Sequence, residues 1–445
     1  MTIVAASESL DTGAVTTFPF TTSADASASL RRSFNRLWSD LAPVGRDPRT
    51  GGYNRLAFTG VDLALREWFV GEAEARGLQV EVDQNGNQWA WWGTPEAHSV
   101  VTGSHLDSVP GGGAFDGPLG VVSSFLAVDA LRAAGVAPRR SLAIVNFIEE
   151  EGSRFGLACL GSRLLTGAID AERARGLTDA NGCSFADTLK AAGISPLGLG
   201  ADPEQLARVG VFVELHVEQG RYLMHGGASV GVASSIQPHG RWHFCFCGEG
   251  NHAGTTALAD RHDPLLPFAE VVSAARHIAL EHGAVSTCGR VRVDPNGTNV
   301  IATAVDAWFD TRGPTAESVT RVMDDLTRAG TAASDQHGVQ LKVTQESSSP
   351  PVVFNVPLRD HLVQSLQVAG IDVPILATAA GHDAGILAST VPTAMLFVRN
   401  PTGISHSPNE FAAESDCIDG VVALATVLTS LLTARELPAR MPVAS

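Results

Sequence analysis

Apolar positions along this chain follow two spacings, one typical of helices and one typical of buried strands. Residues 62–76 carry apolar side chains at helical spacing and are followed by Gly77, a residue type that commonly ends helices. Residues 119–134 show the same spacing. Residues 99–105 (SVVTGSH) are typical of a strand, and residues 141–148 (SLAIVNFI) form a continuous apolar run typical of a strand buried on both faces. This alternation predicts an α/β fold with a mostly parallel sheet covered by helices.

A different rhythm occupies residues 232–343. Two helical segments, near 264–282 and 316–328, lie among about four strand-like segments, which predicts a compact α+β unit inserted into the larger domain. We therefore expect four parts. They are a flexible N-terminal tail (1–28), the first part of a catalytic domain (29–231), the inserted unit (232–343) and the second part of the catalytic domain (344–445).

Composition narrows the classes of function and location. The chain has 31 Lys and Arg against 47 Asp and Glu, a net charge of −16, and we predict no nucleic-acid partner. We find no basic start followed by an apolar run, and we expect no stretch near the roughly 18 apolar residues of a membrane helix. The six cysteines lack a framework spacing, which is typical of a reducing compartment. These features predict a soluble, cytoplasmic protein without a membrane partner.

Two of the cysteines, Cys245 and Cys247, are two residues apart in a predicted strand, so both side chains point to one face. They are either apolar strand residues or half of a zinc site. We favour the first interpretation, because no second cysteine pair accompanies them.

Imidazole and carboxylate side chains follow several predicted strands. In parallel sheets the carboxyl ends of the strands gather ligands. Three acidic residues directly end the buried strand at 141–148, and clustered negative charges there would be costly without cations. Zinc, manganese and cobalt accept imidazole together with carboxylate. The pattern therefore predicts a metal site, built from His105, Asp116, Glu149, Glu150, Glu151, His216 and His406.

At these residues the sequence resembles the M20 metallopeptidase superfamily. The segment from His105 to Asp107 with Asp116, together with EEEGSRFG, ELHVEQG, NHAGTT and GISHSP, is similar to its amidase/carbamoylase branch. That branch includes N-carbamoyl-L-amino-acid hydrolases, β-ureidopropionases and allantoate amidohydrolases. The resemblance, which runs from about residue 50 to 430, implies a two-metal catalytic domain interrupted by a lid that forms a homodimer. It also implies hydrolysis of a carbamoyl or ureido C–N bond in a small substrate that bears a carboxylate.

The resemblance implies a metal-ligand set. Two divalent ions, which could be zinc, manganese, cobalt or nickel, would be bridged by Asp116. Terminal ligands would be His105, Glu151, His216 and His406. Glu150 and Glu151, rather than Glu149, match the family pair because they stand directly before a glycine.

Catalytic and substrate-binding roles are implied in the same way. Glu150 would be the general base, and Asp107 would orient His105 or cap the following loop. His252 would reach the substrate carbonyl, often in a partner subunit's site, as an oxyanion donor. Gln219, Asn299 and Arg312 would contact the substrate, since the planar guanidinium suits a carboxylate. His382, with Asp383, would either line the site or hold a loop.

The sequence is compatible with several substrates and several classes of protein. Allantoate is the first expected substrate, because it carries both a carboxylate and a carbamoyl carbonyl, but N-carbamoyl-L-amino acids and N-carbamoyl-β-alanine carry the same groups. An M20-type peptidase or a metal-free binding protein are further possibilities. A Ser- or Cys-nucleophile amidase is disfavoured, because no cysteine has an evident His partner in the sequence.

Overall fold

The computed structural model describes residues 24–439, which divide into two compact units. The first unit contains residues 24–234, 354–376 and 382–439, and the second contains 235–353 and 377–381. The second unit extends beyond the end of the predicted insertion, 232–343, because its last long strand continues to Ser349. Most of the predicted tail, 1–28, lies outside the described residues. Its last five residues correct the prediction, because they belong to helix α1 (Ala24–Leu41).

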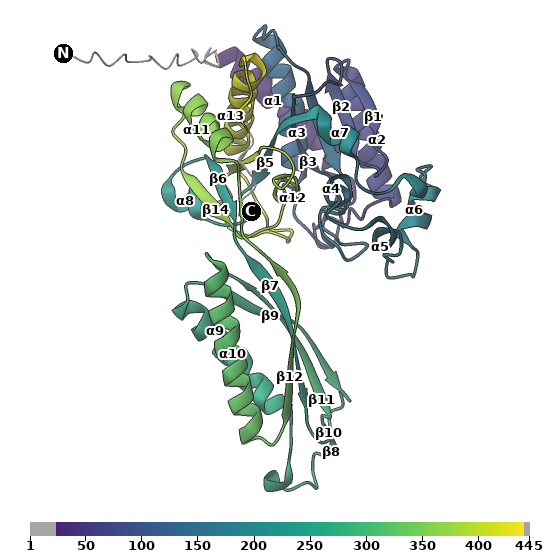
Figure 1. The fold of residues 1–445 in the computed structure, drawn as a ribbon, viewed down its shortest axis with the longest axis vertical. Helices are drawn as coiled ribbons and strands as arrows, with labels where there is room; N and C mark the ends of the chain where they lie inside the picture. Colours follow the sequence, from purple (N-terminus) through teal and green to yellow (C-terminus); the bar gives the residue numbers. More distant parts are fainter. Residues whose placement is uncertain (1–23, 440–445) are drawn as a thin grey trace, which may run out of the picture. The chain divides into compact units, whose positions relative to one another are not determined.

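A mixed sheet with a parallel centre forms the core of the first unit (Figure 1). The four central strands, β4, β3, β5 and β15, pair in parallel, and β1, β2 and β6 add antiparallel pairs at the two edges. This arrangement confirms the predicted α/β fold class. The strands, in sheet order, are β1 (Gln79–Val82), β2 (Gln88–Trp92), β4 (Leu142–Phe147), β3 (Ser99–His105), β5 (Val209–Val217), β15 (Thr393–Val398) and β6 (Val230–Ile236). Short strands β13 (Val352–Val353) and β14 (Ile375–Thr378) pair with β6.

Helices of the first unit pack on this sheet as the apolar patterns predict. Helix α3 (Pro118–Ala133) contacts β3 and β5, and it is buried along most of its length. Its Phe125 ring packs against Trp68 and Phe69. Helix α2 (Gly60–Ala75) lies where helical periodicity predicts it, and α11 (Val356–Val368) is a further helix of this unit. The other helices are too short for periodicity to reveal: α4 (Leu160–Thr166), α5 (Ala171–Arg175), α6 (Phe185–Ala191), α7 (Pro203–Arg208), α8 (Tyr222–Gly226) and α12 (Asp383–Leu387).

Helix α13 (Glu414–Thr433) corrects one expectation. Its mean hydropathy of 1.6 makes it long and apolar enough to cross a membrane by length and composition, so the expectation that no such stretch exists is wrong. However, 83% of this apolar window is buried inside the protein. Its residues Val421, Leu424 and Leu428 belong to the main apolar core, and the helix contacts α3 and β15. The apolar character of α13 is therefore explained by its place in the core.

The second unit, called the lid below, is a four-stranded antiparallel sheet with two long helices (Figure 1). Phe244, Phe246 and Phe309 form an apolar core with residues of both helices. Because side chains alternate along a strand, His243, Cys245 and Cys247 lie on the opposite face. The strands, in sheet order, are β12 (Gln340–Ser349), β7 (His239–Cys247), β11 (Ala304–Arg312) and β9 (Val285–Asp294), and the helices are α9 (Leu265–Glu281) and α10 (Ala316–Gln336). A separate two-stranded ladder joins β8 (Asn251–His252) to β10 (Val300–Ile301).

Candidate metal centre

The parallel strands bring the predicted metal ligands together at their carboxyl ends. His105 is the last residue of β3, His216 is the penultimate residue of β5, and the acidic triplet begins two residues after the end of β4. Asp116 lies just before α3, which begins at Pro118, and His406 lies in the loop after β15. The five residues therefore come from adjacent strands of the sheet and the loops that follow them.

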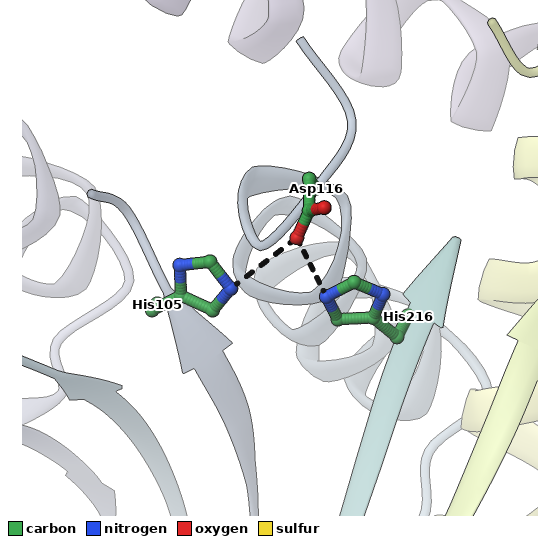
Figure 2. Close-up of side chains that lie close together, drawn as sticks. All are labelled: His105, Asp116 and His216. Atoms are coloured by element: carbon green, nitrogen blue, oxygen red, sulfur yellow. Dashed lines mark ion pairs between the residues drawn. The ribbon is translucent and has the colours of Figure 1, made fainter. Parts of the chain in front are cut away.

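Asp116 is the centre of the cluster. Its Oδ1 lies 3.1 Å from Nε2 of His216 and 3.6 Å from Nε2 of His105 (Figure 2). Its Oδ2 lies 3.5 Å from Nε2 of His406, which is itself 3.5 Å from Oε2 of Glu151. Two groups of three potential ligands, within 4.8 Å of one another in each group, therefore share this one carboxylate. A carboxylate with one oxygen in each group is suited to bridge two cations.

Hydrogen bonding leaves the ligand atoms free for a cation. Nδ1 of His216 donates to the carbonyl oxygen of Val217 at 2.9 Å, so the lone pair is on Nε2 and points toward Asp116. Nε2 of His105, Nε2 of His216 and Oε1 of Glu151 are buried without a hydrogen-bond partner. Buried polar atoms are normally paired, and divalent cations would satisfy all three. The residues present thus fit a metal centre of imidazole and carboxylate ligands.

Asp107 lies behind the centre and contacts both His105 and the acidic triplet. Its Oδ1 lies 3.4 Å from Nδ1 of His105, and its two oxygens accept the backbone N–H groups of Glu150 and Glu151 at 3.2 and 3.1 Å. These contacts support the predicted orienting role for Asp107. They add a second role, because the same carboxylate fixes the backbone of Glu150, the predicted base, and of Glu151, a predicted ligand.

The three consecutive acids point in different directions. Glu149 adopts a left-handed backbone conformation (φ 49°), and its Oε1 accepts the N–H groups of Arg154 and Phe155. Glu150 instead brings Oε2 within 3.7 Å of Nε2 of His105, and Glu151 faces His406. The geometry therefore supports the assignment of Glu150 and Glu151, rather than Glu149, as the predicted base and metal ligand.

Burial is the largest cause of the pKa shifts of these acids in the metal-free protein. It raises the pKa of Glu151 to about 8, with the neighbouring Asp116 carboxylate as the next cause, and it raises the pKa of Glu150 well above its usual range. His216 is also shifted, to a pKa of about 8: burial opposes its charged form, but Asp116 more than offsets that effect. The centre therefore retains protons near neutral pH that bound cations would displace.

Three polar residues hold Asp116 from its outer side. Gln219 donates from Nε2 to Oδ2 of Asp116 at 2.6 Å, and the Ser405 hydroxyl donates to the same oxygen at 3.0 Å. Glu410 accepts the backbone N–H groups of Phe115 and Asp116 at 2.8 and 3.0 Å. Gln219, expected to contact substrate, thus contacts Asp116, the carboxylate that is predicted to bridge the metal ions. Ser405 and Glu410 were not predicted, although both flank His406 in the motif GISHSPNE.

Replacing Glu410 with Ala is expected to weaken metal binding by about tenfold to a hundredfold, the usual effect of losing a group that orients a ligand. Without Glu410, the backbone of Asp116 and the Ser405 hydroxyl lose a shared acceptor. Chelator competition on the purified variant measures the change. Glu410→Gln is the matched control, because its amide oxygen still accepts the two N–H groups, and affinity equal to the wild type in Glu410→Ala would contradict this role.

Two further buried residues line the centre. The His382 ring packs against His216, with centroids 4.5 Å apart, and its Nε2 has no hydrogen-bond partner. The Cys159 thiol donates to Oε1 of Glu150 at 3.3 Å. His382 therefore lies at the predicted site, while Cys159, which sequence reasoning did not select, contacts the predicted base.

The predicted lid residues do not all lie together. Nδ1 of His252 accepts the N–H groups of Gly254 and Thr255, and the carbonyl of Asn299 accepts the N–H of Ala253, so His252 and Asn299 are close neighbours. Arg312 lies at the other end of β11, where it donates to Asp310 and to the carbonyl oxygen of Ala379.

A nine-residue strand spans about 30 Å, so one lid does not bring Asn299 and Arg312 to one carboxylate. The predicted contacts of Asn299 and Arg312 with the substrate stay predictions.

Comparisons with known proteins agree with this geometry. The sequence model of peptidase family M20/M25/M40 matches residues 101–430. An N-carbamoyl-L-amino acid amidohydrolase from Geobacillus stearothermophilus is 34% identical over 395 residues, covering 87% of this chain and 96% of its own length. An allantoate amidohydrolase from Escherichia coli is 33% identical, covering 88% of this chain and 95% of its own length.

Solved structures give the same result. The crystal structure of a hydantoinase/carbamoylase-family amidase from Burkholderia multivorans has a TM-score of 0.81 and 30% identity, covering 91% of this chain and 98% of that one. The matched segment contains all five predicted metal ligands. The chain belongs to peptidase family M20/M25/M40, in its amidase/carbamoylase branch.

Proposed function

We propose that this protein is a two-metal amidohydrolase that cleaves a carbamoyl or ureido C–N bond of a small carboxylate substrate. The observation that carries the proposal is the Asp116 carboxylate, shared between two groups of ligands, with the Glu150 carboxylate beside them. Relatives that are amidohydrolases of allantoate and of N-carbamoyl-L-amino acids support the reaction class. We infer two divalent ions, a homodimer and a cytoplasmic location in line with the sequence.

The chain's own residues supply the proton transfer. When bound, two divalent ions would activate a water molecule and polarise the substrate carbonyl. Glu150 takes a proton from the attacking water and delivers it to the leaving nitrogen. The Cys159 thiol donates a hydrogen bond to Oε1 of Glu150, and Oε2 remains directed toward the centre for this transfer.

The lid residues bind and orient the substrate in this proposal. Arg312 pairs with the substrate carboxylate, and His252 donates to the carbamoyl carbonyl. Because His252 and Arg312 lie at opposite ends of one lid, we infer that a second copy of the chain supplies His252, with Asn299 next to it, to each site. In the proposed homodimer, each active site is therefore completed by His252 of the other copy.

Allantoate is our first candidate substrate, and N-carbamoyl-L-amino acids and N-carbamoyl-β-alanine are the alternatives. The test is ammonia release by purified, manganese-loaded protein on each compound, with and without chelator. Chelator-sensitive turnover of one substrate well above the others is expected. No turnover of any of them by protein with two bound ions would overturn the ureido assignment.

Replacing Arg312 with Met is expected to raise KM for the preferred substrate by about tenfold to a hundredfold, because a charge-assisted, two-fold hydrogen bond to the carboxylate is lost. Steady-state kinetics measures KM and kcat separately. Arg241→Met is the matched control, since Arg241 also pairs with Asp310 in the lid sheet. An unchanged KM in Arg312→Met would exclude Arg312 as the carboxylate ligand.

A further inference from the structure

Two free thiols lie side by side on the face of the lid sheet that is turned away from its helices. The Sγ atoms of Cys245 and Cys247 are 3.4 Å apart, Cys247 is exposed, and Cys245 is half-buried. Neither thiol belongs to the apolar core formed by Phe244 and Phe246 with the lid helices. A pair of accessible, adjacent thiols has no part in the amidohydrolase chemistry proposed above.

The neighbouring strand brings a carboxylate to this thiol pair. Asp306 of β11 is directly opposite Cys245, so their side chains share one face. Nε2 of His243 lies 2.7 Å from Oδ1 of Asp306, and Arg292 of β9 donates to Oδ2 at 2.7 Å. Lys342 of β12 stands opposite Cys245 on the other side. The sequence reveals the spacing of Cys245 and Cys247 but not the nearby carboxylate. Asp306 is 61 positions from Cys245, and only the strand register makes them neighbours.

The geometry favours a bound cation over a disulfide. Residues two apart in a strand have Cα atoms about 6.8 Å apart, at the upper limit for a disulfide, and an S–S bond is about 2.05 Å long. Two sulfur ligands of a tetrahedral zinc ion lie about 3.8 Å apart, since each Zn–S distance is about 2.3 Å. The observed separation of 3.4 Å therefore needs only a small rotation of the side chains to hold a cation.

We propose that Cys245 and Cys247 chelate one thiophilic divalent cation, such as Zn²⁺ or Cd²⁺, and that Asp306 turns toward the cation as a third ligand and exchanges its contact with Arg292 for it. Each thiol releases its proton to solvent as its sulfur binds the cation, and no electron is transferred. His243 donates to Asp306 and orients it, as groups behind a metal ligand commonly do. Because His243 and Cys247 are four residues apart in one strand, about 13 Å, they do not bind one ion together, and water completes the coordination.

The test is a Cd²⁺ titration of the full chain, purified with reductant and with its own metal ions, followed by the near-ultraviolet absorption of cadmium–thiolate bonds. We expect one thiolate-bound Cd²⁺ per chain. Cys245→Ser and Cys247→Ser are each expected to lower the affinity at least tenfold. Cys288→Ser, in the same sheet, is the matched control and is expected to keep the band.

Three outcomes would overturn the proposal. They are the absence of a thiolate band, a band of equal strength in Cys245→Ser and Cys247→Ser, and its loss in Cys159→Ala, which would place the ion at the catalytic centre instead. For the third ligand, Asp306→Asn is expected to weaken Cd²⁺ binding severalfold, whereas Glu346→Gln, a carboxylate that accepts from Trp308 in the same sheet, is not. Equal affinities in these two variants would remove Asp306 from the site.

Discussion

Replacing Glu150 with Gln is expected to lower kcat by about a hundredfold to ten-thousandfold while the protein keeps its metal ions. The amide has nearly the same shape as the carboxylate but cannot take a proton from water. Glu150 is buried, and its Oε2 lies 3.7 Å from Nε2 of His105, close to the ligands without being one of the two groups that share Asp116. Initial-rate kinetics together with metal analysis of the same sample measures both properties.

Glu149→Gln is the adjacent control, because it changes the same residue type one position earlier. Its carboxylate binds the N–H groups of Arg154 and Phe155, and the amide oxygen of glutamine can still accept them. We expect its kcat to stay within about tenfold of the wild type, as a loop contact is kept and no proton carrier is lost. Turnover by Glu150→Gln at the wild-type rate would remove Glu150 as the base, and loss of metal from it would make Glu150 a ligand instead.

The sequence predicts those helices and strands whose apolar pattern is regular over many residues. Strands β3 and β4 lie where runs of apolar residues place them, and helix α3 lies where apolar residues at helical spacing place it. Residues 300–312 do not form a single strand, because they are divided into β10 and β11, separated by two residues, and β10 pairs with β8 rather than with the main lid sheet. Pairing of distant segments has no local signal, so this division could not be read from the pattern.

The candidate site shows the same limit. Its ligands could be predicted because each one ends or follows a strand and carries the right chemistry, as His105 and His216 do. Glu410 has equally strong contacts with the Asp116 loop, but a lone acid in a loop gives no such signal. The separation of Asn299 from Arg312 depends on β11 running as one extended strand from Ala304 to Arg312, which the structure shows.

Removing the metal ions is expected to reverse the effect of pH on stability, and the affinity for these ions is expected to rise steeply with pH. In the metal-free protein, burial raises the pKa of Glu151 to about 8 from an ordinary value of 4.5. Between these values the folded chain holds a proton that the unfolded chain has released, so stability falls as pH rises. His216, with a pKa raised to about 8, acts in the same direction above pH 6.5. Bound cations require the unprotonated forms, so metal affinity is expected to rise by about tenfold per pH unit for each proton displaced.

Thermal unfolding and chelator competition between pH 5 and pH 8 test both halves of this expectation. The apoprotein should lose stability across this range by roughly 1.4 kcal/mol per pH unit for each such group, and the metal-loaded protein should not. Glu151→Gln removes one titrating group, so its apoprotein should show a flatter dependence, while Glu346→Gln in the lid should behave as the wild type. An apoprotein that gains stability from pH 5 to pH 8 would mean that these carboxyls are already ionised in the fold. The charge of the centre would then be offset by some contact other than cations, and the two-metal proposal would lose its main electrostatic reason.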